Sequence, residues 1–115
     1  MVIQDGGKVK FGDYVFIGPN VCFTTAEHAE HALDPEMRKS GVEIAKPIIV
    51  GNNVWIGAGS TILAGVVIGD NTVIGTGSVV KGEIPSGVVA VGVPCKPIRE
   101  ITEEDRYTYP RHNSL

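Results

Sequence analysis

The chain has 115 residues, a net charge of −3 at neutral pH, 43% apolar residues, 6% aromatic residues and 15 glycines. The acidic balance argues against a nucleic-acid partner, because phosphate binding requires a clear basic excess. No apolar run is long enough to span a bilayer, the N-terminal segment lacks the apolar core of a signal peptide, and two cysteines are too few for a disulfide framework. We therefore expect one small domain in the reducing cytoplasm, without a membrane partner.

A six-residue spacing of apolar residues is present from the start of the chain. Phe11, Ile17 and Phe23 are six residues apart, and glycine follows the first two. Upstream, Val2 and Ile3 indicate a further strand. The chain thus starts within a strand pattern, without a capping segment before it. Because a bare end of a stacked structure exposes unpaired strand edges, we expect a preceding segment or a neighbouring chain to cover it.

The spacing is interrupted between Phe23 and Val50, whose separation is not a multiple of six. We expect residues 24–49 to leave the repeating structure as an extruded loop. This polar stretch contains His28 and His31, and functional residues are often found on such excursions from a regular scaffold. A surface loop that merely contains histidines is the alternative interpretation.

The most regular stretch runs from Val50 to Ile84. An aliphatic residue opens each six-residue block, and a small or β-branched residue takes the fifth position. The opening residues are Val50, Ile56, Ile62, Ile68, Ile74 and Val80, and the fifth-position residues are Val54, Ser60, Val66, Thr72, Ser78 and Ile84. A helical period of about 3.6 residues does not produce this spacing, whereas one short strand and one turn per block does.

Three blocks would close one triangular coil of about 18 residues, with the aliphatic side chains pointing inward and returning one coil later. We predict that Val50 stacks on Ile68 and Ile56 on Ile74, with coils roughly 4.8 Å apart. Three asparagines are expected where the turn needs a left-handed backbone or a tight corner, namely Asn52, Asn53 and Asn71. The sequence therefore predicts an all-β fold, a parallel β-helix built from hexapeptide repeats.

After Ile84 the pattern changes to a Pro- and Gly-rich closing region. We predict a β-helix domain over residues 1–101 and a charged C-terminal tail or short helix over 102–115. Thr102 and Asp105 have the spacing of a helix-capping pair. His112 in this tail is expected to be solvated.

Three motifs carry a family resemblance that covers the chain from about Phe11 to Tyr109. They are N-N-V-W-I-G at Asn52–Gly57, G-V-P-C-K at Gly92–Lys96, and T-A-x-H with D-P-x-x-R at Thr25–His28 and Asp34–Arg38. In these motifs the chain resembles the maltose and galactoside O-acetyltransferases of the hexapeptide acyltransferase superfamily. The resemblance implies a left-handed β-helix, a homotrimer, acetyl-CoA as donor and a sugar or similar hydroxyl compound as acceptor. The left hand comes from the resemblance alone, because general connection rules favour a right-handed crossover.

The resemblance also implies a catalytic histidine in the loop, acting as general base on the acceptor hydroxyl. Counting forward from Pro19 places this residue at His28, whereas counting backward from Trp55 places it at His31. The motif T-A-x-H favours His28. Imidazole titrates near neutral pH and suits the removal of a hydroxyl proton during attack on a thioester.

By the same resemblance, one side of the β-helix binds the coenzyme. Trp55 would border the coenzyme tunnel, and an aromatic residue that merely fills a coil corner is the alternative. Ala58 and Thr76, with the pair Gly75 and Gly77, would let the pantetheine arm lie against the backbone.

Basic residues would contact the nucleotide phosphates. The resemblance assigns this role to Lys96 and Arg99. Lys81 would reach a phosphate from one residue earlier than in relatives, which often carry Thr-Lys where this chain has Lys81-Gly82. Relatives also begin with a longer N-terminal segment that supplies much of the acceptor pocket, and activity of this short chain is therefore an open expectation.

Two other functions remain as alternatives. A degenerate or truncated β-helix would serve as a non-catalytic assembly module, which the short N-terminus and the altered turn at Lys81 favour. His28 and His31 suggest a zinc enzyme of the β-helix carbonic anhydrase type, but zinc catalysis needs three protein ligands and only His112 is left. We expect no metal. A trimer is also favoured on physical grounds, because a β-helix of few coils buries little surface alone.

Overall fold

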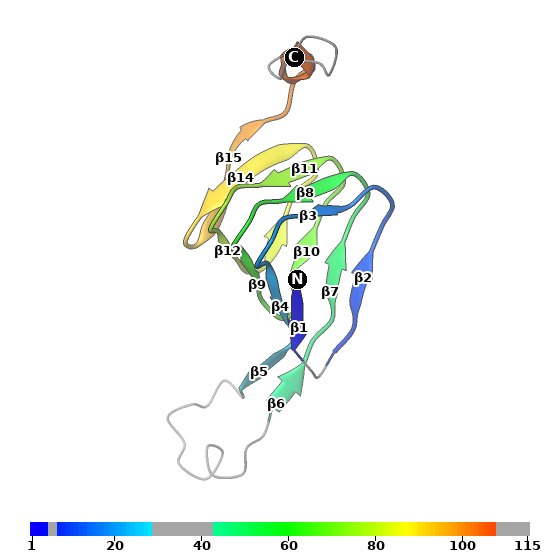
Figure 1. Cartoon of the computed structure of the whole chain (residues 1–115), viewed down its shortest axis with the longest axis vertical. Helices are drawn as coiled ribbons and strands as arrows, with labels where there is room; N and C mark the ends of the chain where they lie inside the picture. Colours follow the sequence, from blue (N-terminus) through cyan, green and yellow to red (C-terminus); the bar gives the residue numbers. More distant parts are fainter. Residues whose placement is uncertain (5–6, 29–42, 108–115) are drawn as a thin grey trace.

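The computed structural model describes residues 1–4, 7–28 and 43–107. Within these ranges, three sheets form the faces of a triangular coil, and a two-stranded hairpin projects from one corner (Figure 1). Sheet A contains β1 (Val2–Gln4), β4 (Cys22–Thr24), β9 (Thr61–Ile62) and β12 (Val79–Val80). Sheet B contains β2 (Val9–Phe11), β7 (Ile48–Val50), β10 (Val67–Ile68) and β13 (Glu83–Ile84).

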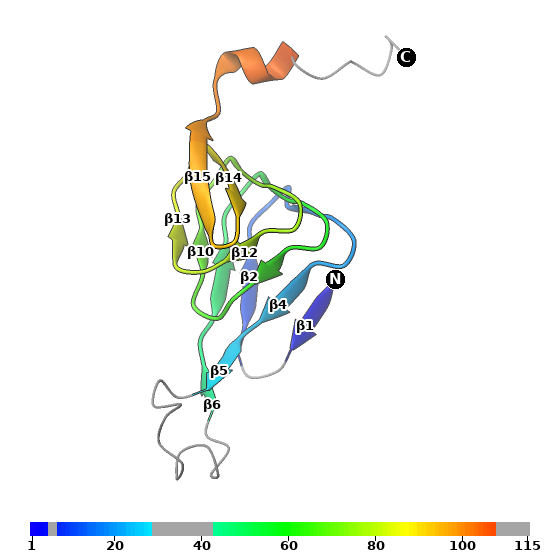
Figure 2. The same cartoon turned by 90° about the vertical axis from the view of Figure 1, so that its left-hand side faces the viewer.

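Sheet C contains β3 (Phe16–Ile17), β8 (Val54–Ile56), β11 (Thr72–Ile74), β14 (Val88–Gly92) and β15 (Cys95–Glu100). Within the three sheets the pairing is parallel except for β15, which folds back antiparallel on β14. The projecting hairpin consists of β5 (Ala26–His28) and β6 (Glu43–Ala45), and a 3-10 helix, η1 (Glu103–Tyr107), follows β15. Figure 2 shows η1 beyond the β14–β15 end of the coil. In the described part of the chain, no helix has the length and apolar character needed to cross a membrane.

The chain passes repeatedly from sheet B to sheet C to sheet A, so the structure has three corners, which we name B–C, C–A and A–B after the sheets that they join. The predicted stacking is confirmed: Val50 pairs with Ile68 and Ile56 with Ile74 in parallel register. The six opening aliphatic residues are each at most 2% exposed, so they form the axial core.

The last coil is shorter than predicted. Ile84 was expected at the fifth position of its block, but it stacks directly on Ile68. The cause lies at the A–B corner, where only Lys81 and Gly82 separate β12 from β13, while residues 63–66 separate β9 from β10 in the coil before. Gly82 has φ 71°, a left-handed conformation that makes so short a turn possible.

Asparagine side chains form a ladder at the B–C corner. Asn53 and Asn71 have φ of 55° and 54°, as predicted, and the side-chain amide of Asn53 donates to Oδ1 of Asn71 at 2.8 Å. Asn52 also lies at this corner, between β7 and β8, as predicted, but without a left-handed backbone. Instead, Oδ1 of Asn52 accepts a hydrogen bond from the backbone N–H of Asp13 at 2.8 Å. Each coil is thereby tied to the next at this corner.

Candidate functional site

The hairpin that carries His28 leaves the solenoid at the A–B corner. Residues 24–49 were predicted to leave it, whereas Thr24 still belongs to sheet A and Ile48 already belongs to sheet B. His28 is the last residue of β5 and is paired with Glu43 of β6 in the antiparallel register. His31 and His112 lie outside the described residues.

Trp55 lies on the outer face of sheet C and not in a corner. The register places Phe16, Trp55, Val73 and Val89 in one row across neighbouring strands. Trp55 is 54% exposed, and its ring centroid is 5.2 Å from that of Phe16. The alternative interpretation of Trp55 as a half-buried residue that fills a coil corner is therefore wrong about its place, because Trp55 lies within a strand. The outer face of sheet C presents an aromatic surface to a ligand or a neighbouring chain.

The C–A corner, which contains Ala58 and Thr76, consists mainly of glycine and small residues, so much of its surface is backbone; we call it the backbone ledge. A Cβ atom at Gly57 would lie 2.6 Å from the backbone nitrogen of Thr76, so the two coils are in direct contact there. Gly59 and Gly77 have φ of 71° and 72°, and a Cβ at either would point into open space. Glycine alternates with Ala58, Ser60, Thr76 and Ser78 at this corner, so side chains cover little of the backbone there.

A β-bulge aligns the two predicted phosphate ligands on one face. Residues three apart in a regular strand point to opposite faces. In β15 the register shifts at Val89, so that Lys96 is opposite Val91 and Arg99 is opposite Val89. Cross-strand partners share a face, so both basic side chains lie on the outer side of sheet C. No feature of the sequence analysis predicts this bulge.

Arg99 is held by an acidic residue of η1. The guanidinium binds Asp105 through both of its terminal nitrogens, at 2.9 and 3.0 Å, and the backbone N–H of Thr102 donates to Oδ2 of Asp105 at 2.7 Å. The hydrogen bond from Arg99, followed by that from Thr102, lowers the pKa of Asp105. The expected capping pair of Thr102 and Asp105 is confirmed, since Asp105 caps the start of η1.

The structure separates the predicted site residues into two groups. Trp55, Ala58, Thr76, Lys96 and Arg99 lie on the outer face of sheet C or on the adjoining C–A corner. Lys81 is exposed at the A–B corner, the corner from which the His28 hairpin projects. Figure 1 shows the hairpin and sheet C on opposite sides of the coil. Within one chain, His28 and Lys81 therefore do not meet the other five residues.

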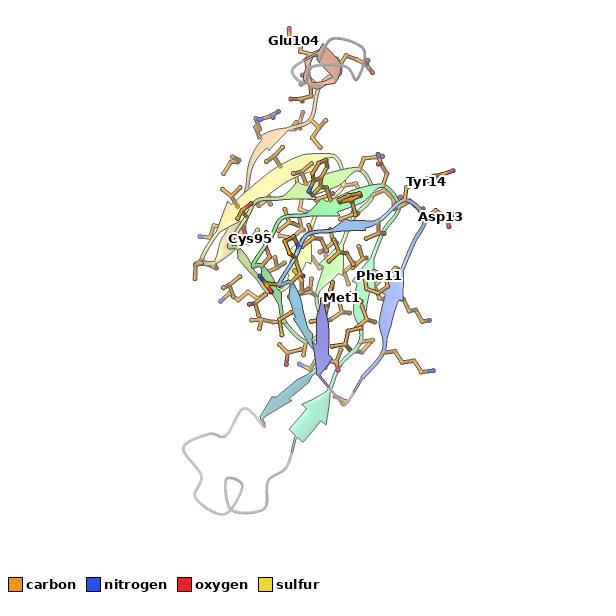
Figure 3. All side chains as sticks on the ribbon, viewed as in Figure 1. Met1, Phe11, Asp13, Tyr14, Cys95 and Glu104 are labelled. Carbon is orange, nitrogen blue, oxygen red and sulfur yellow. The ribbon has the colours of Figure 1, made fainter. Side chains whose placement is uncertain are left out.

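A groove of about 940 Å³ lies between sheet C and the start of η1 and was not predicted from the sequence. Its lining includes Tyr14, Phe16, Trp55, Asn71, Thr102 and Asp105. Tyr14 is 89% exposed at the B–C corner (Figure 3) and has φ 58°. The sequence contained a sign of this groove, because the corner position that is asparagine in the later coils, at Asn53 and Asn71, is the aromatic residue Tyr14 in the first coil.

Neither cysteine is placed as a nucleophile. Cys95 is 5% exposed, and burial raises the pKa of its thiol despite a hydrogen bond with Ser78. Cys22 is half-buried in sheet A. Among the residues that the structure describes, no cluster of three or more His, Cys, Asp or Glu side chains could hold a metal ion.

Comparison with known proteins shows the family. Residues 47–82 match the family described as bacterial transferase hexapeptide (six repeats). The structure of a maltose O-acetyltransferase from Clostridium difficile 630 is 34% identical, with a TM-score of 0.66 over 89% of this chain and 70% of that one. The chain belongs to the hexapeptide-repeat acyltransferases, in the maltose and galactoside O-acetyltransferase group. Its fold is the left-handed parallel β-helix that the resemblance implied.

Two other members of this acyltransferase family are closely similar. The galactoside O-acetyltransferase of Escherichia coli is 49% identical over 109 residues, which is 95% of this chain and 52% of the relative. A galactoside acetyltransferase solved in complex with coenzyme A superimposes with a TM-score of 0.86 at 48% identity, covering 96% of this chain and 54% of that one. The chain spans about half the length of the curated relatives that it matches.

Proposed function

We propose that this chain forms the donor-binding part of an acetyl-CoA-dependent O-acetyltransferase, which transfers acetyl to a hydroxyl of a sugar or a similar small acceptor. The observation that carries the proposal is the similarity to the coenzyme A complex of a galactoside acetyltransferase over nearly the whole chain. A sugar acceptor is favoured because related proteins are described as galactoside and maltose O-acetyltransferases. The proposal requires no metal.

The predicted coenzyme ligands fit the shape and charge of acetyl-CoA. The backbone ledge at Ala58 and Thr76 would take the pantetheine arm, and Trp55 would cover it from the outer face of sheet C. Lys96 and Arg99, which the bulge of β15 aligns, would contact the phosphates. Arginine and lysine bind phosphate by hydrogen bonds and by charge, respectively.

His28 would act as the general base. Its imidazole takes the proton of the acceptor hydroxyl as that oxygen attacks the thioester carbonyl, and then returns the proton to the departing thiolate sulfur. The carbon–oxygen bond of the ester forms, the carbon–sulfur bond breaks, and free coenzyme A is released. No covalent enzyme intermediate is needed when acceptor and donor bind together.

We further propose that the site forms between chains of a cytoplasmic homotrimer. His28 and Lys81 lie at the A–B corner, and the remaining ligands lie on sheet C and the C–A corner, on the other side of the coil. In the proposed cyclic assembly, the A–B corner of one chain would lie against the sheet C face of the next. Each interface would then complete one site, with His28 of one chain facing Trp55 of its neighbour.

Calorimetric titration with coenzyme A, on protein whose oligomeric mass is measured in the same buffer, is the first test. One coenzyme per chain in a trimer supports the proposal. A folded trimer that binds no coenzyme A contradicts it and supports the non-catalytic assembly module. Acetyl transfer to galactosides and maltose then tests the base: His28→Ala should abolish transfer and leave coenzyme affinity and trimer unchanged. Loss of activity in His31→Ala instead would reassign the base.

A further inference from the structure

Thr25 is the least exposed residue at the base of the hairpin, and the proposed mechanism gives it no role. It lies between β4, which ends at Thr24, and β5, which begins at Ala26. Its exposed fraction is 0%, and it is one of four buried polar residues in the described part of the chain. It is also the first residue of the T-A-x-H motif that ends at His28. A buried hydroxyl needs a structural or functional reason, because burial without hydrogen bonds is costly.

Two hydrogen bonds connect Thr25 to segments far away in the sequence. Its Oγ1 accepts a hydrogen bond from the backbone N–H of Gly7 at 2.8 Å, and its carbonyl oxygen accepts one from the backbone N–H of Lys46, also at 2.8 Å. Gly7 precedes β2, and Lys46 follows β6. Thr25 therefore joins the first coil to the point where the hairpin leaves the solenoid and the point where it returns.

The backbone is closely packed around this junction. A Cβ atom at Gly7 would lie 3.0 Å from Cβ of Thr25 and 3.0 Å from the carbonyl oxygen of Lys46. The bond from Lys46 also extends the β5–β6 ladder by one step, because the next pair is Ala26 with Ala45. The ladder continues to His28, only three residues beyond Thr25. The position of the His28 backbone thus depends directly on this junction.

We infer that Thr25 is a positioning residue for His28: its hydroxyl and carbonyl fix the exit of the hairpin relative to the first coil. This inference rests on the proposed role of His28 as general base. A misplacement of about 1 Å is enough to reduce a rate roughly 100-fold when a base must meet a bound hydroxyl. Binding of coenzyme A, which uses sheet C and the C–A corner, does not depend on the junction.

The test compares Thr25→Val, which removes the hydroxyl, with Thr25→Ser, which keeps it. Thr72→Val is the matched control, because Thr72 is 1% exposed and its hydroxyl donates to the carbonyl oxygens of Asp70 and Pro85 at 3.2 and 3.1 Å. Thr72 begins β11 of sheet C, but its side chain is buried and it is not among the proposed coenzyme ligands. Hydrogen exchange, kcat and coenzyme affinity are measured for all variants in the full chain.

In Thr25→Val we expect the amides of β5 and β6 to exchange about tenfold faster. The value of kcat should fall about 100-fold while the Kd of coenzyme A stays within about twofold of wild type. Thr25→Ser should restore both values, and Thr72→Val should reduce stability without a change in kcat. Unchanged exchange in β5 and β6, an equal loss of kcat in Thr72→Val, or no recovery with serine would overturn the inference.

Failure of the proposed function gives a different result. If wild type does not transfer acetyl, or if His28→Ala transfers it normally, the catalytic role of Thr25 is overturned together with that of His28. Faster exchange in β5 and β6 of Thr25→Val would in that case show a purely structural junction. If wild type transfers acetyl and needs His28 to do so, but Thr25→Val has no effect, only the positioning role of Thr25 is overturned.

Discussion

Two glycines at the C–A corner allow a sharp test of how closely the coils pack. A Cβ atom added at Gly57 would lie 2.6 Å from the backbone nitrogen of Thr76 and 2.9 Å from the carbonyl carbon of Gly75. These contacts are with backbone atoms, so no side-chain rotation can relieve them, and the next coil must move. We expect Gly57→Ala to lower the free energy of unfolding by about 3 kcal/mol, the upper part of the range for overpacking.

Gly59 provides the control two residues away. It has φ 71°, and a Cβ there would meet no atom within 4 Å. Gly59→Ala should therefore cost only the left-handed conformation, about 1 kcal/mol. Equilibrium urea unfolding of both variants, with equal m-values, gives the two free energies. If Gly59→Ala were as destabilising as Gly57→Ala, the cost would come from backbone conformation, and the argument for direct contact between coils would fail.

Three other predictions follow from the site. The pKa of Asp105 is lowered, so its pairing with Arg99 stabilises the fold fully at pH values above the ordinary pKa of 3.8. This stabilisation is lost as the pH falls through the lowered pKa. Asp105→Asn should remove this pH dependence of the unfolding free energy below pH 4. It should also raise the affinity for coenzyme A, measured by calorimetry, by about twofold to fivefold, because Arg99 loses a competing anion. Iodoacetamide at pH 8 should leave Cys95 unmodified in native protein, by mass spectrometry, because burial raises the pKa of its thiol. When inactive His28→Ala and Trp55→Ala chains are co-expressed and assemble at random, about a quarter of the sites should regain both wild-type residues if each site spans two chains. No site should regain both if each site lies within one chain.

The core could be predicted from the sequence because one simple pattern determines it. A position that returns at every sixth residue always faces the axis, so the burial of Val50, Ile56 and Ile62 followed from spacing alone. The existence of a loop between Phe23 and Val50 followed from a break in that spacing, although β4 extends to Thr24 and β7 begins at Ile48. The assignment of His28, in contrast, came from the resemblance, since spacing does not distinguish it from His31.

The last coil and the closing strand could not be predicted in this way. Ile84 is apolar and would be buried in either register, so its identity did not reveal the two-residue turn at Lys81 and Gly82. The bulge of β15 likewise depends on how β15 meets β14 in space. Without it, Lys96 and Arg99 would have been placed on opposite faces of the strand, and a shared phosphate site would have been rejected.

Regular and irregular positions therefore have different roles in this chain. Aliphatic residues that follow the six-residue pattern point inward and stabilise the coil, so their side chains are not available to a ligand. The hairpin at Thr25, the short turn at Lys81, the left-handed Tyr14 and the bulge of β15 all depart from the pattern. Each departure places a polar, charged or aromatic side chain where the regular coil would not. The hairpin and the turn at Lys81 lie at the A–B corner, whereas Tyr14 and the bulge lie on or beside sheet C, so the proposed closed ring of chains would bring the two groups together.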